Sequence, residues 1–363
     1  MTGSEHGSEP TAASFAERLD AQLLGALEIV CVFLGDRLGL YGALATGGPR
    51  TSVELSEELG LAERYVREWL EQQAVSGVLE VDDPTAGAAE RRYRLPAGHE
   101  TVLLDAQSLD YRRATVRGTV ATALELSSVL EVFRTGGGLA WHEVEYETDE
   151  VRDANRAWFE RDLAGWLAAD RGVHARLSDA SRPAWVADVG CGAGWSSIAI
   201  AGAYEGVRVH GIDANGRAIE LARRHADRAR VGDRVTFAVA DAADLDGGPY
   251  ELVCFFECLH DMSRPVDALR RARELLAEGG AVLVGDEKTA GVFTAPGDEL
   301  ERSLYAWSVL SCLPYGMSGE DPAGTGAVMR PARLRRYGEA AGFERFEDLP
   351  IEHPAWRFTL LQP

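Results

Sequence analysis

One short stretch, AWVADVGCGAGWSSIAI at residues 184–200, constrains the fold of this chain more than any other. A buried-type apolar run leads into three glycines at alternate positions, and an apolar helical pattern follows. A strand that enters a helix through a glycine-rich turn is typical of α/β sheets that hold a nucleotide-like ligand. The stretch therefore predicts a parallel sheet with a ligand site at the carboxyl edge of its strands.

The part of the chain after Ser181 alternates between β-type runs and amphipathic helical runs, a pattern typical of a parallel sheet with helices on both faces. We predict strands at 185–189, 207–212, 235–240, 250–256 and 281–285. We predict helices at 215–229, 264–278 and 331–342, and a final antiparallel hairpin of strands at 343–351 and 355–363. The predicted fold class is therefore α/β, with a Rossmann-like sheet.

The first part of the chain has a different, mainly helical pattern. Residues 1–12 are small and polar, and we expect them to be disordered. A helix is predicted from Phe15 to Leu40, and it is apolar nearly all round between Leu23 and Leu34. Such a helix needs cover on several sides, which a second subunit supplies in a homodimer. A core helix of the same chain is the alternative.

Residues 51–95 have the pattern of a winged helix. Thr51 and Glu54 match a capping box at the start of a short helix that ends near Gly60. A second amphipathic helix follows the glycine, and two helices joined by such a turn form a helix-turn-helix. The runs GVLEV and RRYRL then form a β-hairpin. We therefore predict a winged-helix and dimerisation domain at 13–104.

A winged helix can bind DNA with its second helix, but the charges of this chain argue against that role. The second helix carries Glu63, Glu68 and Glu71 beside Arg64 and Arg67, and the formal net charge of the whole chain is −21. Tight nucleic-acid binding needs a basic surface. We expect a structural or dimerisation role for this domain, a small-molecule substrate, and no nucleic-acid or membrane partner.

Two segments are rich in aromatic and apolar side chains, which suit the wall of a substrate pocket. The first lies within the helical stretch 105–180, which we interpret as a linker and substrate cap. The second is the insertion 286–332, a candidate lid within the domain at 181–363. Core packing is the alternative for both. The candidate lining residues are Trp141, His142, Tyr146, Tyr305, Trp307, Leu313 and Met317.

The glycine turn argues against a dinucleotide. A dinucleotide-binding turn has a small residue at its third conserved position, and this chain has Trp195 there. An acid, Asp188, instead precedes the turn, where it can attract through water the ammonium and sulfonium charges of S-adenosylmethionine. Glycines allow the main chain to approach the methionine part of that cofactor without a Cβ clash. The turn glycines are Gly190, Gly192 and Gly194.

Acidic residues also follow the next two strands. Asp213 lies 21 residues after Gly192, a spacing that suits hydrogen bonds to both hydroxyl groups of a ribose. Ala214 adjoins this position. Asp241 can accept a hydrogen bond from the adenine amino group, and the amide of Ala242 can donate to the ring. Together these strand ends predict S-adenosylmethionine as the cofactor.

Residues 181–363 resemble a class I S-adenosylmethionine-dependent methyltransferase, through VADVGCGAG, GIDAN, ADAADL, YELVCFFECLHDM and LLAEGGAVLVGDE. The whole chain resembles actinobacterial methyltransferases with an N-terminal winged-helix domain, and its layout is similar to that of dimeric small-molecule O-methyltransferases. The resemblance implies a seven-stranded sheet of order 3-2-1-4-5-7-6 and a homodimer built on the N-terminal helices. It also implies methyl transfer to a small, aromatic or polyketide-like acceptor, with S-adenosylhomocysteine as the product.

The segment after the strand at 250–256 is expected to carry the chemistry. In plant-type O-methyltransferases a His-Asp pair follows this strand and its His is the general base; His260 and Asp261 match that pair. An imidazole titrates near neutral pH, as a general base requires. Those enzymes also have an acid after the fifth strand that orients the His, and Asp286, or alternatively Glu287, matches it. A second interpretation is that His260 caps the next helix or binds a cofactor carboxylate. Main-chain contacts with the methionine end of the cofactor are expected at Phe256 and Glu257.

Several alternatives stay open from the sequence. Met262 replaces the Trp that follows the His-Asp pair in the plant enzymes, so the methylated atom can be oxygen, nitrogen or carbon. The fold could also use the cofactor for decarboxylation, hydroxylation or a pericyclic step, or serve a DNA-binding regulator that senses the cofactor. The five scattered cysteines indicate reduced thiols in the cytoplasm, and no metal site is predicted.

Overall fold

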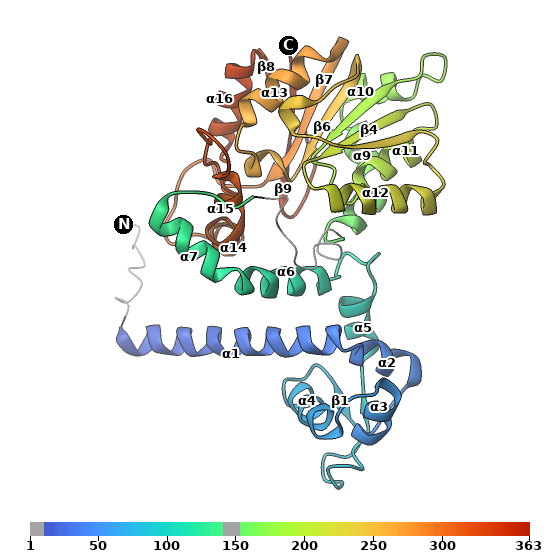
Figure 1. Cartoon of the computed structure of the whole chain (residues 1–363), viewed down its shortest axis with the longest axis vertical. Helices are drawn as coiled ribbons and strands as arrows, with labels where there is room; N and C mark the ends of the chain where they lie inside the picture. The colour runs from blue at the N-terminus through green and yellow to red at the C-terminus, as the bar shows by residue number, and fades with distance from the viewer. Residues whose placement is uncertain (1–10, 141–152) are drawn as a thin grey trace, which may run out of the picture. The chain divides into compact units, whose positions relative to one another are not determined.

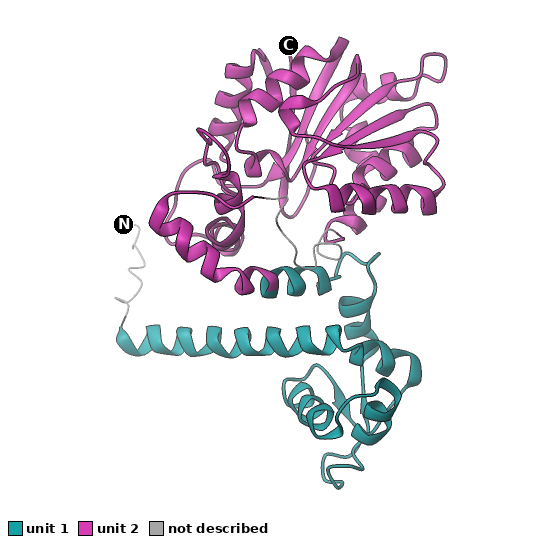
Figure 2. Ribbon diagram, viewed as in Figure 1, with its two compact units in different colours: residues 1–120 teal, residues 121–363 magenta. Residues whose placement is uncertain are grey.

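The computed structural model describes residues 11–140 and 153–363. The chain forms two compact units, residues 1–120 and 121–363, which are coloured separately in Figure 2. Each unit has a hydrophobic core of its own. The domain boundaries predicted from the sequence, including a separate segment at 105–180, stay predictions.

The second unit is built on one sheet of seven strands in the order β5-β4-β3-β6-β7-β9-β8 (Figure 1). Numbered along the sheet's own part of the chain, this is the predicted order 3-2-1-4-5-7-6, which is therefore confirmed. Neighbouring strands are parallel except for β9, which is antiparallel to both β7 and β8. The strands are β3 Trp185–Val189, β4 Arg208–Asp213, β5 Val235–Val239, β6 Tyr250–Phe256, β7 Leu276–Glu287, β8 Arg345–Asp348 and β9 Trp356–Gln362.

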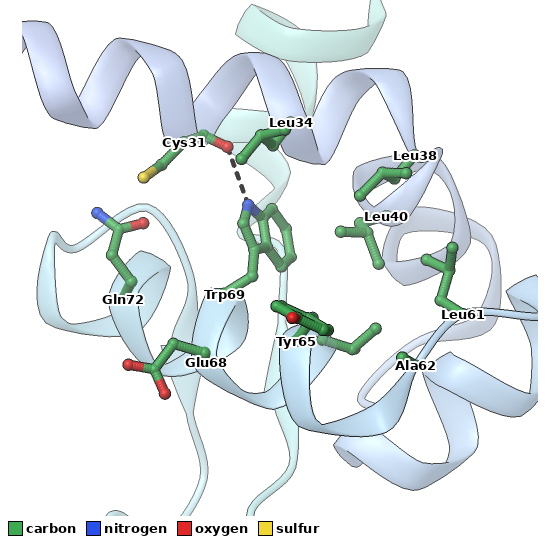
Figure 3. A pocket seen from close by; sticks show the side chains of 11 residues that line it. Cys31, Leu34, Leu38, Leu40, Leu61, Ala62, Tyr65, Glu68, Trp69 and Gln72 are labelled. Atoms are coloured by element: carbon green, nitrogen blue, oxygen red, sulfur yellow. Dashed lines mark hydrogen bonds between the residues drawn. The ribbon is translucent and has the colours of Figure 1, made fainter.

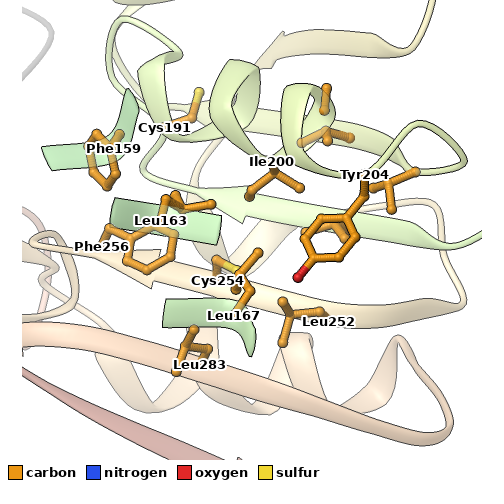
Figure 4. Packing of buried hydrophobic residues seen from close by; sticks show 14 of the residues in the cluster. Phe159, Leu163, Leu167, Cys191, Ile200, Tyr204, Leu252, Cys254, Phe256 and Leu283 are labelled. Atoms are coloured by element: carbon orange, nitrogen blue, oxygen red, sulfur yellow. The ribbon is translucent and has the colours of Figure 1, made fainter. Parts of the chain in front are cut away.

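Helices cover both faces of this sheet, as the alternating pattern predicted. One face packs against α9 Arg156–Ala168, α10 Arg171–Leu177, α11 Trp195–Ala203 and α12 Gly216–Ala229. The other packs against α13 Pro265–Glu274 and α16 Pro331–Ala341. Figure 4 shows part of the first core, where Leu163, Ile200 and Leu252 are fully buried between helices and sheet. Burial of apolar area on both faces is the main term that stabilises such a sheet.

The strand order reverses direction between β3 and β6. From β3 the chain proceeds outward through β4 and β5, then returns to place β6 on the other side of β3. In open α/β sheets the crevice at the carboxyl ends of two such strands is the usual ligand site. This topology puts the glycine turn that follows β3 beside the segment that follows β6.

The structure corrects one predicted boundary. The helix predicted at 264–278 ends at Glu274, and β7 begins two residues later at Leu276. Leu276 pairs with Tyr250 across a register shift, and the Tyr250 amide donates to the Leu275 carbonyl at 2.8 Å. Pairing with a neighbouring strand therefore decides this segment, and helical periodicity alone could not reveal it.

The predicted insertion at 286–332 has helical structure of its own. It contains α14 Glu299–Trp307, the π-helical turn η4 Ser308–Cys312 and α15 Leu313–Gly316. Shorter helical turns follow two strands of the sheet, η2 Ala242–Asp244 after β5 and η3 Leu259–Asp261 after β6. The unit also contains α7 Leu126–Thr135.

The first unit has the predicted winged-helix pattern. Its elements are α1 Ala12–Arg37, α2 Leu40–Gly47, α3 Ser52–Leu59, α4 Glu63–Val75, β1 Glu80–Val81, β2 Tyr93–Arg94, α5 Ala97–Leu104 and the start of α6 Arg113–Leu124. The capping box at the start of α3 is formed, since Thr51 accepts from the Glu54 amide and Glu54 accepts from the Thr51 amide. Strands β1 and β2 pair antiparallel as the predicted hairpin.

The long helix α1 keeps an apolar face outside the core of its own chain. Leu23 is 55% exposed and Leu27 is 68% exposed. Near its C-terminal end, α1 and α4 line an apolar groove of about 530 Å³ (Figure 3), where the Trp69 indole donates to the Cys31 carbonyl at 2.9 Å. Among the described residues, no helix combines the length and the apolar character that a membrane span requires.

Candidate functional site

The glycine turn links β3 to α11 with three left-handed residues. Gly190, Gly192 and Gly194 have φ values of 71°, 53° and 81°, which L side chains rarely adopt. Two of them also meet their neighbours closely. A Cβ at Gly190 would lie 2.7 Å from the Cβ of Cys258, and one at Gly194 would lie 2.8 Å from the Phe237 ring. The turn therefore needs glycine for its own packing as well as for an exposed main chain.

Asp213 ties the end of β4 to this turn. Its Oδ2 accepts from the Gly192 amide at 2.9 Å, and its Oδ1 accepts from the Asn215 amide at 2.8 Å. The side chain is half-buried. The carboxylate thus lies directly beside the glycine turn, at the strand end where the sequence placed a ribose-binding acid.

Asp188 lies at the base of the turn and is buried. Its Oδ2 accepts from the hydroxyls of Ser196 and Ser197 at 2.6 and 2.5 Å. Burial raises the pKa of Asp188 to about 6, and the two serine hydrogen bonds limit the rise. The carboxylate therefore anchors the first turn of α11, and its predicted attraction for the cofactor's charges stays a prediction.

The predicted adenine-binding residues lie at the end of β5. Asp241 is exposed and caps η2 by accepting from the Ala243 amide at 2.8 Å, and it lies 3.4 Å from the Arg264 guanidinium. Ala242 begins η2, and Ala214 is exposed after β4. The structure thus brings the ends of β3, β4 and β5 to one edge of the sheet.

The end of β6 approaches the same turn from the other side. The Cys258 thiol donates to the Val189 carbonyl at 3.1 Å, next to the first turn glycine. The preceding residue, Glu257, is left-handed with φ of 50°, a conformation that costs energy in a residue with a side chain. Its carboxylate accepts from the Asn155 side chain at the start of α9. The predicted neighbour Phe256 is buried in the core.

Trp195 served in the sequence only as an argument against a dinucleotide. In the structure its side chain contacts residues from several segments. Its ring stacks on His225 with centroids 4.2 Å apart, and the Arg156 guanidinium lies 4.0 Å from its centroid. Its indole N–H donates to Asp153 at 2.7 Å. Residues 153–156 therefore contact both Trp195 and Glu257. The sequence offered no signal for this connection, because α9 and α11 are far apart along the chain.

His260 is the centre of a buried acidic cluster. The side chain is 2% exposed; its Nδ1 lies 2.7 Å from Asp286 Oδ1, and its Nε2 lies 3.3 Å from Asp261 Oδ1. Burial alone would lower the pKa of His260, but the charges of Asp261 and Asp286 outweigh it and raise the pKa well above its ordinary value. The structure therefore brings the three predicted catalytic residues together.

Cys312 is a member of this cluster that the sequence did not indicate. It lies at the end of η4, and its thiol hydrogen-bonds with His260 and Asp261. Within the described chain, His260, Asp261 and Cys312 are a group of side chains that could bind a metal ion. Their ligand atoms lie within 4.8 Å of one another. Metals bind the thiolate, whereas burial raises the pKa of Cys312 to about 12. We therefore interpret the group as a hydrogen-bonded cluster.

A pair of glutamates lies next to the His260 cluster. Glu287 is the last residue of β7, is buried, and hydrogen-bonds with Glu257. Burial raises the pKa of Glu257 to about 7, and burial together with the charge of Glu257 raises the pKa of Glu287 to about 9. Glu287 is the second candidate from the sequence for orienting the His, and in the structure Asp286 makes that contact.

The predicted acceptor wall is placed only in part. Trp141, His142 and Tyr146 lie outside the described residues. Leu313 and Met317 bracket α15, and a Cβ on Gly316 of this helix would lie 3.4 Å from the Asp261 carbonyl. Trp307 ends α14, and Tyr305 on the same helix accepts from Arg330 at 3.3 Å. The α15 side of the insertion thus adjoins His260.

Comparison with known proteins agrees with both parts of the chain. Residues 186–280 match the model of a methyltransferase domain, and residues 25–116 match that of an Rv2258c-like winged HTH domain. The 27-O-demethylrifamycin SV methyltransferase of Amycolatopsis mediterranei (strain S699) is 37% identical over 101 residues, which are 27% of this chain and 37% of that protein. The chain spans about a third of the length of the first curated relatives that it matches.

Solved structures share the fold over almost the whole chain. The mitomycin 7-O-methyltransferase has a TM-score of 0.72 at 20% identity and covers 97% of this chain and 98% of its own. Human N-acetylserotonin methyltransferase, solved in complex with SAM, has a TM-score of 0.68 at 16% identity and covers 98% and 99%. The chain therefore contains a methyltransferase domain and an Rv2258c-like winged helix-turn-helix domain, within the fold of the O-methyltransferases.

Proposed function

We propose that this protein transfers a methyl group from S-adenosylmethionine to an oxygen of a small-molecule acceptor. The observation that carries the proposal is His260, held by Asp286 at 2.7 Å, beside the crevice between β3 and β6. When bound, the cofactor supplies an electrophilic methyl carbon on a sulfonium. The chain supplies the site, the orientation and the base.

The residues present fit this cofactor. Asp213 offers carboxylate oxygens beside the glycine turn for the ribose hydroxyls, and Asp241 with the Ala242 amide would bind adenine. The other end of the crevice is rich in buried carboxyl groups, and the buried Asp286 Oδ2 has no hydrogen-bond partner in the described chain. A cluster of buried carboxyl groups suits a ligand that carries positive charge.

His260 would act by accepting the proton of the acceptor. Its Nδ1 is occupied by Asp286, so its Nε2, which lies 3.3 Å from Asp261 Oδ1, is the nitrogen that would accept the proton. Asp286 fixes the ring orientation and stabilises the imidazolium that forms. A correctly placed base contributes roughly 10²–10⁴-fold to such a step. The burial of His260, which is 2% exposed, would limit the access of water to this nitrogen.

We propose a flat or apolar acceptor of the aromatic or polyketide-like class, in secondary metabolism. The apolar side chains of Leu313, Met317 and Trp307 on the insertion support this, because apolar walls suit a flat or apolar acceptor. A curated relative named for a rifamycin acceptor and a structural neighbour named for mitomycin also support it.

We further propose that the protein works as a homodimer in the cytoplasm. The apolar face of α1 that is exposed in the single chain supports a dimer, since a contiguous exposed apolar face on a soluble protein usually marks an interaction site. The cytoplasm is supported by the cysteines, because none of them forms a disulfide within the described residues.

The cofactor assignment is tested by calorimetry with the full chain. Asp213→Ala should weaken S-adenosylmethionine binding at least about tenfold, because a hydrogen bond to a charged group is worth about 1.5–3 kcal/mol. Asp213→Asn keeps one oxygen for the turn amides and separates this loss from local unfolding. Asp233→Ala, an exposed acid before β5, is the control. Unchanged affinity in Asp213→Ala would contradict the ribose assignment, and a wild-type protein that binds no S-adenosylmethionine would contradict the function.

A further inference from the structure

The glutamate pair formed by Glu257 and Glu287 has no use in the mechanism above. The two residues follow adjacent parallel strands, and the Glu257 amide donates to the Gly285 carbonyl at 2.8 Å. Their carboxyl groups hydrogen-bond with each other, and Asn155 is the further side-chain donor to Glu257. The strained φ of 50° at Glu257 places this carboxyl toward the start of α9.

A positive partner for the pair is missing among the residues that the structure describes. Among residues 11–140 and 153–363, no Lys or Arg forms a hydrogen bond or ion pair with either glutamate. His260 is the cationic group that acts on both, but its ring nitrogens already face Asp286 and Asp261. Buried charges in proteins are normally paired. The carboxyl groups here outnumber the cations available to them.

An independent observation also indicates a missing partner. Asp286 uses Oδ1 for His260 and for the Glu287 amide, while its Oδ2 has no hydrogen-bond partner in the described chain. The residue is 5% exposed. A buried carboxylate oxygen left without a donor is costly. The charge of Asp286 acts on both glutamates, so this oxygen belongs to the same acidic environment.

The pair also adjoins the cofactor crevice. Cys258, next to Glu257, binds the Val189 carbonyl at the start of the glycine turn. On the other side, residues 153–155 connect Glu257 to Trp195, the first residue after that turn. A ligand bound on the glycine turn at the β3 and β6 strand ends would therefore meet this pair.

We propose that Glu257 and Glu287 bind the positively charged methionine end of the cofactor, and that they favour the sulfonium of S-adenosylmethionine over the neutral thioether of S-adenosylhomocysteine. This rests on the proposed function. The pair thus determines which form of the cofactor binds more tightly. It retains S-adenosylmethionine and helps to release S-adenosylhomocysteine.

The charge of the pair depends on pH in a way that supports this role. With pKa values raised to about 7 for Glu257 and about 9 for Glu287, the pair is neutral below about pH 6 and carries one negative charge near pH 8. The neighbouring groups that set these values are His260 and Asp261 on η3 and Asp286 on β7. Preference for the sulfonium should therefore rise with pH.

The test measures Kd values of S-adenosylmethionine and S-adenosylhomocysteine by calorimetry on the full chain, near pH 6 and near pH 8. Wild type should favour S-adenosylmethionine about tenfold near pH 8 and less near pH 6, since an ionised carboxylate attracts the sulfonium charge and not the neutral thioether. The double variant Glu257→Gln/Glu287→Gln should lose this preference at both pH values and bind S-adenosylhomocysteine within about threefold of wild type. Glu278→Gln, an exposed acid on β7, is the matched control.

Folding of the double variant is checked by its melting temperature. We expect no fall, because glutamine keeps the shape and hydrogen bonds of the pair while removing the repulsion between two carboxyl groups. A double variant that keeps the wild-type preference, or a wild type that binds both nucleosides equally at both pH values, would overturn the inference alone. A wild type that binds neither would overturn the proposed function and the inference with it.

Discussion

His260 has an environment that changes how it can act as a base. Asp261 and Asp286 both face its ring, and their charges raise its pKa well above the ordinary value although burial opposes this. The imidazolium form is therefore favoured at neutral pH. A general base must lose this proton first, so turnover should increase as the pH rises through the raised pKa of His260.

The charge balance at His260 can be tested without an acceptor. Asp286→Asn removes one of the charges that raise the pKa of His260, so the imidazole should titrate at lower pH in this variant than in wild type. NMR titration of the full chain measures both values. His260→Ala identifies the resonance, and Asp267→Asn, whose side chain on α13 is 45% exposed, should leave the titration unchanged. Equal midpoints in wild type and Asp286→Asn would contradict the orienting contact.

At the scale of elements, α1 exposes apolar side chains of a kind that proteins usually bury. A partner subunit would cover them. Most of its apolar side chains are exposed within the chain, and Gly35 is its buried residue. The adjoining groove against α4 is also apolar, with Leu34, Leu38 and Tyr65 on its wall (Figure 3). A two-fold dimer uses the same patch on both subunits, so one apolar helix face supplies both halves of the interface.

A charge placed on this face should separate the proposed dimer. Leu23→Glu with Leu27→Glu removes apolar contact worth about 1.5–3 kcal/mol for each fully buried side chain and puts like charges opposite each other. Light scattering after size exclusion should show a dimer for wild type and a monomer for the variant. Glu17→Gln on the same helix should remain dimeric. A wild type that is monomeric at all accessible concentrations would contradict the proposal.

For the molecule as a whole, the balance of charge argues against a DNA-binding role. The net charge is −21, and the arginines of the winged helix are already paired with glutamates of the same unit. Arg91 lies 2.7 Å from Glu71, and Arg92 lies 3.0 Å from Glu54. The further pairs are Arg64–Glu68, Arg67–Glu63 and Arg94–Glu80. Little unpaired basic charge therefore remains on the described part of the winged helix for phosphate contacts.

We therefore expect no specific mobility shift of duplex DNA by the full-length protein. Phosphate binding by Lys and Arg falls steeply with salt, so the measurement is made at low and at physiological salt, with and without S-adenosylmethionine. Any residual low-salt shift should disappear at physiological salt. A sequence-dependent shift that persists there and responds to the cofactor would support the regulator instead.

The sequence by itself determined those features that arise from local pattern. Alternating apolar runs gave the α/β class, and the capping residues Thr51 and Glu54 marked the start of α3. The turn glycines and the acid Asp213 stand at predictable strand ends because carboxyl ends of parallel strands meet at one edge. The strand order came from resemblance and is confirmed by the sheet.

Only the tertiary structure decided which side chains meet across long distances in the chain. No local pattern could place Cys312 against His260, stack Arg156 and His225 on Trp195, or join Glu257 with Glu287. The start of β7 at Leu276 likewise depends on its pairing with β6. The physical reason is the same in each case: these contacts come from separate elements that the packed sheet brings together, and burial among them then sets the charge of the groups.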